Sequence, residues 1–477
     1  MNNSKLKTQN SKLPSAVAHA VAYMREWLGL GFLLAVFSTV EVKLPMPLFL
    51  LANGSFVFYA SEFAVGAGII AAVILYIKKS YRPSPTVRAV LTALAAFLAW
   101  YVIVFASRVL LSYQPTPSVL TLRTTVLPIF ILLMMDMGWE NGRRCILGLT
   151  VYNFAICAVQ IYYATAGLVR MSPFMGNLMV FTCAAVMLVP TNFYVIYQNT
   201  RGRCGPLYSA MAMFNIFCVI FFSFMGGARS TVAASILGIA ASFAIFWRKP
   251  VVKKRAYGAV ILSFAVILAL WIGNFGGKAI DGIYRVVPTP SAVASKLGME
   301  ELAKILPGGD DYEMPGSKGN GKVSAKNRIK IVQIEKEKSD IARSDLWASS
   351  LASIARSPVI GEGIIYFEFR NDYNVDRQAA HNFILEHINA YGTVGFIFWA
   401  VLLIIPTWVL GFSPKYGRIK KRKIPKLCLI CSVGMMAVQS LAQPTMMVVP
   451  TVTLLWLVIG SWYDTIVSTR NSKCANQ

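Results

Sequence analysis

The sequence predicts an all-α polytopic membrane protein, with about twelve transmembrane helices and a large, mainly helical loop between the ninth and the tenth. Three observations support this prediction. Only 14% of the 477 residues are charged and 56% are hydrophobic, whereas a soluble globular chain carries about a quarter charged residues. The apolar residues gather in runs of about twenty, enough to cross a hydrocarbon core about 30 Å thick. The basic residues are concentrated in alternate loops.

The apolar runs place the expected spans along the chain. Residues 1–26 precede them as a polar, basic tail, and because no small-residue cleavage site follows a short apolar region, we expect the first span to be an uncleaved anchor. This span is the weakest, since Glu41, Lys43, Pro45 and Pro47 interrupt its outer end. The spans are expected near residues 27–44, 60–77, 89–111, 121–138, 145–167, 174–197, 207–226, 230–247, 256–274, 390–411, 425–442 and 446–466.

Lysine and arginine set the expected orientation, because they are enriched in cytoplasmic loops. One set of alternate loops, together with both termini, holds 26 of the 46 basic residues, while the short loops of the other set hold five. We therefore expect both termini in the cytoplasm, with spans within 27–274 and 381–466 and a C-terminal tail at 467–477. The large loop, 275–380, is then expected on the outer face.

The formal charge of +25 does not indicate nucleic-acid binding. The large loop holds the remaining 15 basic residues but also 14 acidic ones, so it is nearly neutral. The excess positive charge belongs to the cytoplasmic loops, where membrane insertion and anionic lipid headgroups account for it. Membrane lipids are therefore expected partners, and nucleic acid is not.

The large loop has its own expected organisation. Residues 307–321 are rich in glycine, proline and acidic residues, which is typical of a turn-rich stretch. Residues 325–356 are expected to form a helix with Ser339 as a plausible N-cap. Three apolar residues at helical spacing, Trp347, Leu351 and Ile354, share one face of this helix, and Arg343 lies on or beside that face. The sequence Ser-Pro-Val-Ile-Gly-Glu-Gly is expected to end the helix.

Cysteine placement excludes a disulfide-stapled outer domain. All eight cysteines lie in apolar runs or short basic loops, and none lies in the large loop. Cys428 and Cys431 form a Cys-x-x-Cys inside an expected membrane helix, where packing is the simpler interpretation than redox or metal chemistry.

Two of the three histidines occur together where the large loop returns to the membrane, in His381-Asn-Phe-Ile-Leu-Glu-His387. Histidine suits proton transfer near neutral pH, although an interfacial histidine is often a capping or packing residue. His381 and His387 are separated by about 240° around a helix, so they cannot share one metal ion. The sequence also lacks a His-Glu-x-x-His and an Asp-x-Asp motif, and we expect no metal and no cofactor.

Several arginines are expected near the outer face. Arg229 lies at the tight junction between the seventh and eighth spans, where a charge is costly unless it faces a cavity, a partner or the interface. Arg170 precedes the sixth span, and Arg108 and Arg123 flank the loop between the third and fourth, where interfacial anchoring is the simpler interpretation. Guanidinium groups donate bidentate hydrogen bonds to phosphate, so such a cluster can hold a diphosphate and neutralise it as it leaves.

The histidine segment resembles a known family signature. His381-Asn382, nine residues, Gly392, two residues and Gly395 resemble the His-[Asn/Ser/Gln]-x9-Gly-x2-Gly pattern of bacterial O-antigen ligases and related polysaccharide polymerases. Further landmarks occur in the expected order over about residues 165–411. They are Arg170 with Gly176-Asn177, Gly226-Gly-Ala-Arg229-Ser230, and Arg343-x-x-x-Trp347 followed by Ser357-Pro-Val-Ile-Gly-Glu-Gly363.

The resemblance implies a bacterial inner-membrane enzyme with a helical outer loop over a cavity. It implies a glycan donor on undecaprenyl diphosphate, an acceptor that is lipid A-core or another glycan, and metal-independent transfer with inversion. His381 then corresponds to the base, and Arg229 and Arg343 to the diphosphate clamp. The remaining substrate-binding candidates are Arg108, Arg123, Arg170, Trp347 and Asn382. The extra length at 300–325 departs from the family pattern and leaves the acceptor side open.

Three interpretations remain. The first is a glycosyltransferase, either a ligase or a polymerase, which the sequence barely separates. The second is a transporter or flippase for lipid-linked oligosaccharides, against which stand the missing internal repeats and the lack of intramembrane carboxylates, since Glu62 and Asp136 lie near span ends. The third is a membrane scaffold for polysaccharide assembly.

Overall fold

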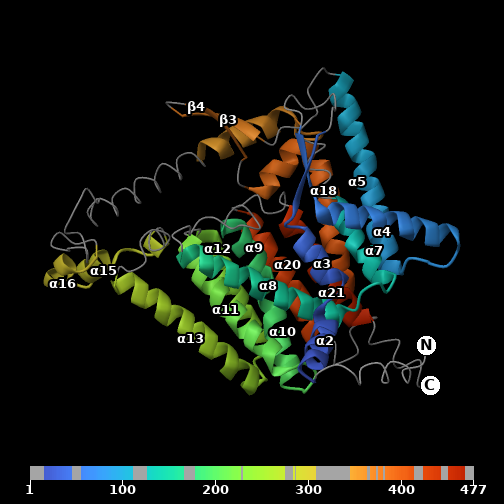
Figure 1. Ribbon diagram of the computed structural model, residues 1–477. Helices are drawn as coiled ribbons and strands as arrows, with labels where there is room; N and C mark the ends of the chain where they lie inside the picture. The colour runs from blue at the N-terminus through green and yellow to red at the C-terminus, as the bar shows by residue number, and fades with distance from the viewer. Residues whose placement is uncertain are drawn as a thin grey trace.

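The structure is a computed structural model that describes residues 15–45, 55–110, 126–165, 178–226, 229–273, 283–284, 286–307, 344–362, 366–371, 374–379, 382–412, 423–441 and 449–467. Helices dominate these residues, together with two small hairpins (Figure 1). In chain order the elements are α2 (Ser15–Trp27), α3 (Leu30–Phe37), β1 (Glu41–Pro45), β2 (Ser55–Tyr59), α4 (Ala60–Ile77), α5 (Pro85–Leu110), η2 (Leu127–Ile129), α7 (Phe130–Asp136), α8 (Gly142–Thr165), α9 (Leu178–Met187), α10 (Val189–Asn199), α11 (Pro206–Gly226), α12 (Arg229–Ile245), α13 (Pro250–Gly273), α15 (Pro290–Lys296), α16 (Glu300–Ile305), β3 (Tyr366–Asn371), β4 (Asn374–Ala379), α18 (Phe383–Phe412), α20 (Lys423–Ser440) and α21 (Val449–Val467).

Six helices in the described part of the chain are long and apolar enough to cross a membrane, and a bent pair brings the number to seven. The protein is therefore a multi-pass membrane protein. The six segments coincide with six predicted spans, and they are Ala60–Ile77, Pro85–Ser107, Gly142–Tyr163, Pro206–Gly226, Pro250–Gly273 and Phe383–Phe412. The bent pair, Ala20–Trp27 with Leu30–Phe37, corresponds to the first predicted span and bends by 74°.

The other five predicted spans are not among the helices that are both long and apolar enough to cross a membrane within the described residues. Two of them, 425–442 and 446–466, do coincide with single helices, α20 of 18 residues and α21 of 19 residues. Near 121–138 the helical segment runs only over Leu127–Asp136, and α12 has 17 residues. Near 174–197 the helix divides into α9 and α10, because Pro190 lies in the first turn of α10 and lacks the N–H that a continuous helix needs. The predicted number of twelve is thus not established, and six or seven spans are.

Two antiparallel hairpins depart from the all-α prediction. The first predicted span was expected to continue to residue 44, but α3 ends at Phe37 and β1 pairs with β2 instead, with Glu41 opposite Tyr59. The second hairpin joins β3 to β4 inside the large loop, with Asn371 opposite Asn374. Phe367 and Phe369 alternate there with charged residues, a period of two that is typical of a strand.

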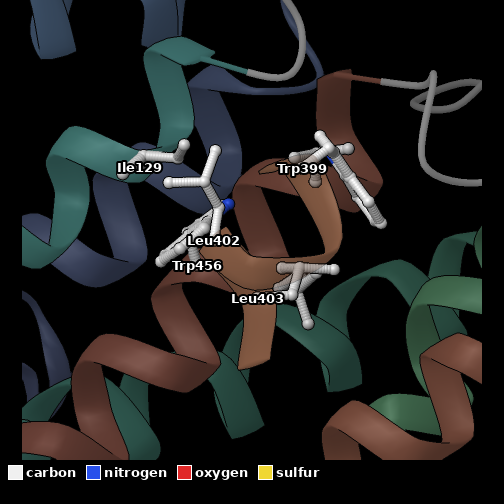
Figure 2. Close-up of a pocket in the computed structure, with 7 residues that line it drawn as sticks. Ile129, Trp399, Leu402, Leu403 and Trp456 are labelled. Atoms are coloured by element: carbon white, nitrogen blue, oxygen red, sulfur yellow. The ribbon is translucent and has the colours of Figure 1, made fainter. Parts of the chain in front are cut away.

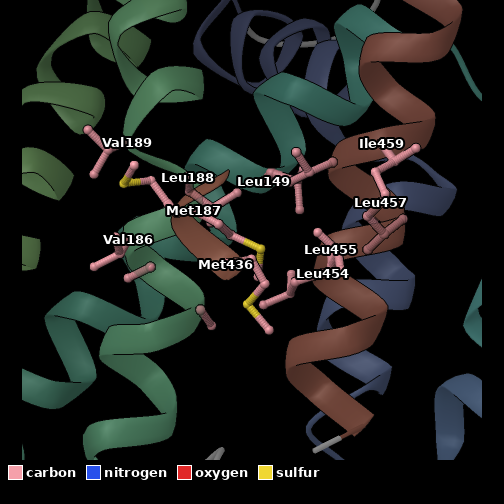
Figure 3. Close-up of a cluster of buried hydrophobic side chains, with 14 of the residues drawn as sticks. Leu149, Val186, Met187, Leu188, Val189, Met436, Leu454, Leu455, Leu457 and Ile459 are labelled. Atoms are coloured by element: carbon pink, nitrogen blue, oxygen red, sulfur yellow. The ribbon is translucent and has the colours of Figure 1, made fainter. Parts of the chain in front are cut away.

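The core lies among α8, α9, α10, α20 and α21, which pack against one another in the middle of the bundle. Figure 3 shows apolar side chains from these five helices meeting in one cluster, with Met436 of α20 among them. Both tryptophans of α21, Trp456 and Trp462, are almost completely buried. These central helices are held by packing from all sides, and the more lipid-exposed helices α4, α5, α13 and α18 surround them.

Several basic loops meet at one end of the bundle. Arg143 at the start of α8 pairs with Glu26 of α2, at 2.6 Å. Arg255 near the start of α13 donates to Asn199 at the end of α10, also at 2.6 Å. The sequence assigned these arginines to the same set of alternate loops, and the structure brings them together. We call this region the basic end.

Carboxylates organise the basic end further. Asp136, at the end of α7, accepts hydrogen bonds from the hydroxyl of Tyr81 (2.6 Å), the backbone N–H of Ser84 (2.9 Å) and the hydroxyl of Tyr463. Burial, together with the hydrogen bond to Asp136, raises the pKa of Tyr81. One carboxylate thereby joins the α4–α5 loop, α7 and α21.

Candidate functional site

The segment that carries the predicted histidine signature begins at the N-terminus of α18. Asn382 caps this helix, since its side-chain oxygen accepts from the backbone N–H groups of Ile384 (3.0 Å) and Leu385 (3.3 Å). The asparagine of the signature therefore has a structural role as an N-cap. His381 is adjacent to it in sequence and lies outside the described residues.

The second feature of the signature is a break inside α18. Gly392 has φ 72° and ψ 172°, which interrupts the helix and separates a short segment, 383–391, from a longer one, 393–412. A Cβ atom at this position would overlap the backbone carbonyl of Val359, so only glycine allows this close approach. Gly395, three residues later, faces the indole of Trp100 in α5, 3.1 Å from the position that a Cβ would take.

The turn after helix 344–356 meets this break. Gly361 has φ 65°, and a Cβ there would lie 2.5 Å from the backbone nitrogen of Gly392. The two glycines thus lie back to back, with main chain against main chain. Three hydrogen bonds join this turn to α18. Thr393 donates to the carbonyl of Pro358 through its N–H (2.9 Å) and its hydroxyl (2.8 Å), and the N–H of Glu362 donates to the carbonyl of Asn389 (2.8 Å).

Side chains reinforce the contact, and Glu362 is central among them. Its carboxylate accepts two hydrogen bonds from the guanidinium of Arg356, at 2.6 and 2.9 Å, and one from the hydroxyl of Ser353, at 2.7 Å. The buried Asn389 donates through its side chain to the hydroxyl of Ser350. We call this set of contacts between residues 344–362 and α18 the loop clasp.

Helix 344–356 shows an unexpected face to the bundle. The sequence grouped Trp347, Leu351 and Ile354 on one face, but Trp347 and Leu351 are exposed and Ile354 is only half-buried. The buried face consists of Leu346, Ser350 and Ser353 instead. The hydrogen bonds of Ser350 and Ser353 to Asn389 and Glu362 explain why small polar residues face inward here.

His387 is a packing residue. Its ring is fully buried among Phe383, Tyr391 and Trp399, with ring centroids 3.9 Å from Phe383 and 4.9 Å from Trp399. Its Nδ1 lies 3.2 Å from the carbonyl oxygen of Phe383, four residues earlier in the helix. Of the two histidines in the segment, this one has no access to solvent and supports the fold of α18.

Arg229 is the first residue of α12 and is exposed. The backbone N–H groups of a first helical turn and the helix dipole both favour anions, and the guanidinium adds a full positive charge at the same place. The turn before α12 is short, since α11 ends at Gly226. These are general features of anion sites, and the role of Arg229 itself stays a prediction.

The described residues include three of the eight predicted site residues, namely Arg229, Trp347 and Asn382. His381, Arg343, Arg170 and Arg123 lie outside the described residues, and only the backbone of Arg108, in α5, is described. The convergence of His381, Arg229 and Arg343 therefore stays a prediction. Glu362 was not singled out from the sequence. The glycines of its Pro-x-x-Gly-Glu-Gly context were noted, but the carboxylate between them was not.

A pocket elsewhere in the bundle does not contain these residues. It lies between η2, α18 and α21 and is lined by apolar side chains alone, among them Ile129, Trp399, Leu402 and Trp456 (Figure 2). With no ionisable group in its lining, it has no residue that could move a proton or bind a phosphate. It is not the candidate catalytic site.

Part of the chain matches a known protein family. Residues 214–400 match the family model described as O-antigen ligase. The matched segment begins within α11, contains Arg229, and ends in α18 beyond Asn382, Gly392 and Gly395, so the loop clasp lies inside it. No curated protein matches the chain.

Proposed function

We propose that the protein transfers a glycan from undecaprenyl diphosphate to an acceptor hydroxyl at the outer face of the bacterial inner membrane. The basis is the match of residues 214–400 to the O-antigen ligase family, an enzyme family of glycosyl transfer linked to lipopolysaccharide biosynthesis. The acceptor is lipid A-core, as in a ligase, or the end of another glycan, as in a polymerase. Both termini and the basic end face the cytoplasm in this proposal, and residues 275–380 face outward.

The proposed reaction is a single displacement. His381 removes the proton from the acceptor hydroxyl, and the acceptor oxygen attacks the anomeric carbon of the donor. The bond between that carbon and the diphosphate oxygen breaks on the opposite side, which inverts the configuration. Undecaprenyl diphosphate leaves with the electron pair of the broken bond, and Arg229 and Arg343 stabilise the charge that develops on it.

One observation supports this proposal best: the loop clasp joins the segment that follows Arg343 to the segment that follows His381. Residue 344 begins the described helix directly after Arg343, and Asn382 caps α18 directly after His381. The clasp between these two segments includes direct backbone contact at Gly361 and Gly392, which fixes position closely. Ser350 and Asn389, which this junction brings into contact, lie seven residues after Arg343 and eight residues after His381, so the two candidates adjoin segments that pack together.

The test is a set of substitutions assayed with purified protein, lipid-linked donor and acceptor. We expect His381→Ala to lower transfer by about 100-fold or more, because general-base catalysis typically contributes that much. His19→Ala is the matched control, since this histidine belongs to α2 and not to the matched segment. Normal transfer by the His381 variant, with monodisperse protein in detergent, would overturn the proposed mechanism.

Two variants of Arg343 distinguish the effect of its positive charge from the effect of its planar, bidentate shape. Arg343→Lys keeps the charge but loses the planar, bidentate donor pair, so we expect it to lose most of the activity that Arg343→Ala loses. Full activity of the lysine variant would assign Arg343 a general electrostatic role and not a clamp.

A deletion strain distinguishes the two acceptors. Loss of polymer from the surface lipid, with free polymer accumulating, identifies a ligase, and a ladder collapsed to one repeat unit identifies a polymerase. Flux of a lipid-linked oligosaccharide across proteoliposomes with no covalent product would instead support a transporter and would contradict the proposal.

A further inference from the structure

Helix 344–356 differs from an ordinary surface helix, because small polar side chains lie on its buried side and large apolar side chains lie on its exposed side. Its buried side includes Ser350 and Ser353, both almost fully inaccessible, whereas Trp347 is 40% exposed and Leu351 56% exposed. Val359, in the turn that follows, is 55% exposed. Exposed apolar side chains that are grouped in this way mark a surface that contacts a membrane or another protein.

The accessible surface of this helix has two distinct sides. At 3.6 residues per turn, Trp347 and Leu351 lie within about 40° of each other. Asp345, Ser349 and Arg356 lie on an arc about 160° to 200° from Trp347, and all three are exposed. An apolar side and a polar side on the accessible part of one helix are typical of a helix at a lipid–water boundary.

The apolar side is continuous with the lipid-facing surface of α18. The part of α18 after the break, 393–412, has 20 residues and a length of about 30 Å, enough to cross the hydrocarbon core. Its exposed residues Thr393, Ile397, Ile404 and Trp408 recur at helical spacing and form one stripe. Thr393 at the end of this stripe bonds to Pro358, so the neighbouring Val359 lies where the stripe reaches the membrane boundary.

We propose that helix 344–356 and the turn 357–360 lie in the lipid–water interface on the side of the membrane where α18 begins, with Trp347, Leu351 and Val359 in contact with the acyl chains of that leaflet. The partner is bulk membrane lipid. Continuity with the exposed stripe of α18 argues for lipid, since the same leaflet already covers that stripe. Trp347 matches the preference of tryptophan for the headgroup level, and the Arg356–Glu362 pair, on the other side of the helix, faces water.

This inference extends what the loop does. Anchored in this way, the large loop holds the residues next to the helix at the depth of the lipid headgroups, and Arg343 immediately precedes the first described residue of the helix. A diphosphate attached to a prenyl chain occupies the same depth. The membrane contact itself does not depend on the transfer reaction.

Site-directed spin labelling of the full chain in bilayers tests the anchor. Six native cysteines are buried, and replacing Cys183 and Cys474 by alanine removes the other two, so labels can be placed at Leu351→Cys and Val359→Cys, with Ser349→Cys on the polar side as the matched control. The same protein without an added cysteine gives the background signal. In vesicles of phosphatidylethanolamine and phosphatidylglycerol, collision with oxygen reports lipid and collision with a nickel chelate reports water.

We expect the labels at 351 and 359 to be several-fold more accessible to oxygen than to the nickel chelate, and the label at 349 to show the reverse. Equal nickel accessibility at 349 and 351 would overturn the proposal. A label at 351 that is immobile and inaccessible to both reagents would also overturn it, since another protein surface would then cover the helix. If Ser349→Cys does not fold, Asp345→Cys replaces it. None of these measurements requires transfer activity, so their outcome is independent of the proposed reaction.

Discussion

The basic end and the loop clasp hold the chain together by different means. At the basic end, carboxylate side chains receive hydrogen bonds from other elements: Asp136 joins three segments, and Asp464 of α21 accepts from the backbone N–H of Gly142 at 2.7 Å. At the loop clasp, Gly361 and Gly392 bring two backbones into direct contact, and side chains only supplement it.

This difference predicts different tolerance to substitution. A carboxylate can be replaced by an amide that keeps part of the hydrogen bonding. A glycine whose missing Cβ makes room for another main chain has no such replacement. The basic end is therefore expected to tolerate conservative changes, and the loop clasp is not.

The largest effect is expected at Gly392. Gly392→Ala adds a Cβ that overlaps the carbonyl of Val359 and demands a positive φ that alanine rarely adopts. We expect a loss of about 3 kcal/mol in stability or undocking of residues 344–362, together with loss of transfer. Thermal unfolding in detergent and limited proteolysis of the large loop measure the two outcomes.

Gly434→Ala in α20 is the control for this change. A Cβ at position 434 meets no atom within 4 Å, and the backbone is helical, so alanine is expected to be neutral or to stabilise by up to about 1 kcal/mol. If both alanine variants behaved alike, close backbone contact would not be what distinguishes the loop clasp.

An intermediate effect is expected at Asp136. Asp136→Ala removes the acceptor for Tyr81, Ser84 and Tyr463 together, at a cost of about 2–3 kcal/mol, whereas Asp136→Asn keeps one acceptor oxygen and is expected to cost about half as much. Thermal unfolding of the two variants in parallel gives the ratio. An asparagine variant as unstable as the alanine variant would contradict the tolerance ascribed to the basic end.

The smallest effect is expected at Glu362. Glu362→Gln weakens the pair with Arg356, in which the arginine side chain is 65% exposed and the glutamate side chain 15%, but glutamine keeps an oxygen that can accept from Ser353, so we expect a loss of about 1 kcal/mol. The backbone hydrogen bond from residue 362 to Asn389 remains. We therefore expect near-normal transfer, and a loss of stability as large as that of Gly392→Ala would show that side chains, and not backbone contact, dominate the loop clasp.

Much of this architecture follows from the sequence. Apolar run length identified the positions of the six long apolar helices, and in part that of the bent pair, because crossing a membrane needs about twenty apolar residues whatever the neighbours are. The spacing of Gly392 and Gly395 after Asn382 was visible as a signature. Its cause was not, because a positive φ at Gly392 depends on Val359, which is more than thirty residues away in sequence.

The remaining features depend on tertiary contacts. The sequence did not identify the inward side of helix 344–356, because Ser350 and Ser353 form buried hydrogen bonds that no local pattern reveals, while Trp347 and Leu351 are exposed. The hairpin β1–β2 was missed because Val42 and Leu44 also suit an apolar helix. Periodicity alone cannot separate these two states over five residues.

The back-to-back glycines also determine how freely the rest of the large loop can change. Main-chain contacts do not depend on the identity of neighbouring side chains, and the backbone part of the loop clasp involves only a short turn and one break in α18. Segments upstream of helix 344–356 can therefore change in length and sequence without changing this contact. Under the proposed function, such segments can diversify to select different acceptors while the loop clasp keeps its shape.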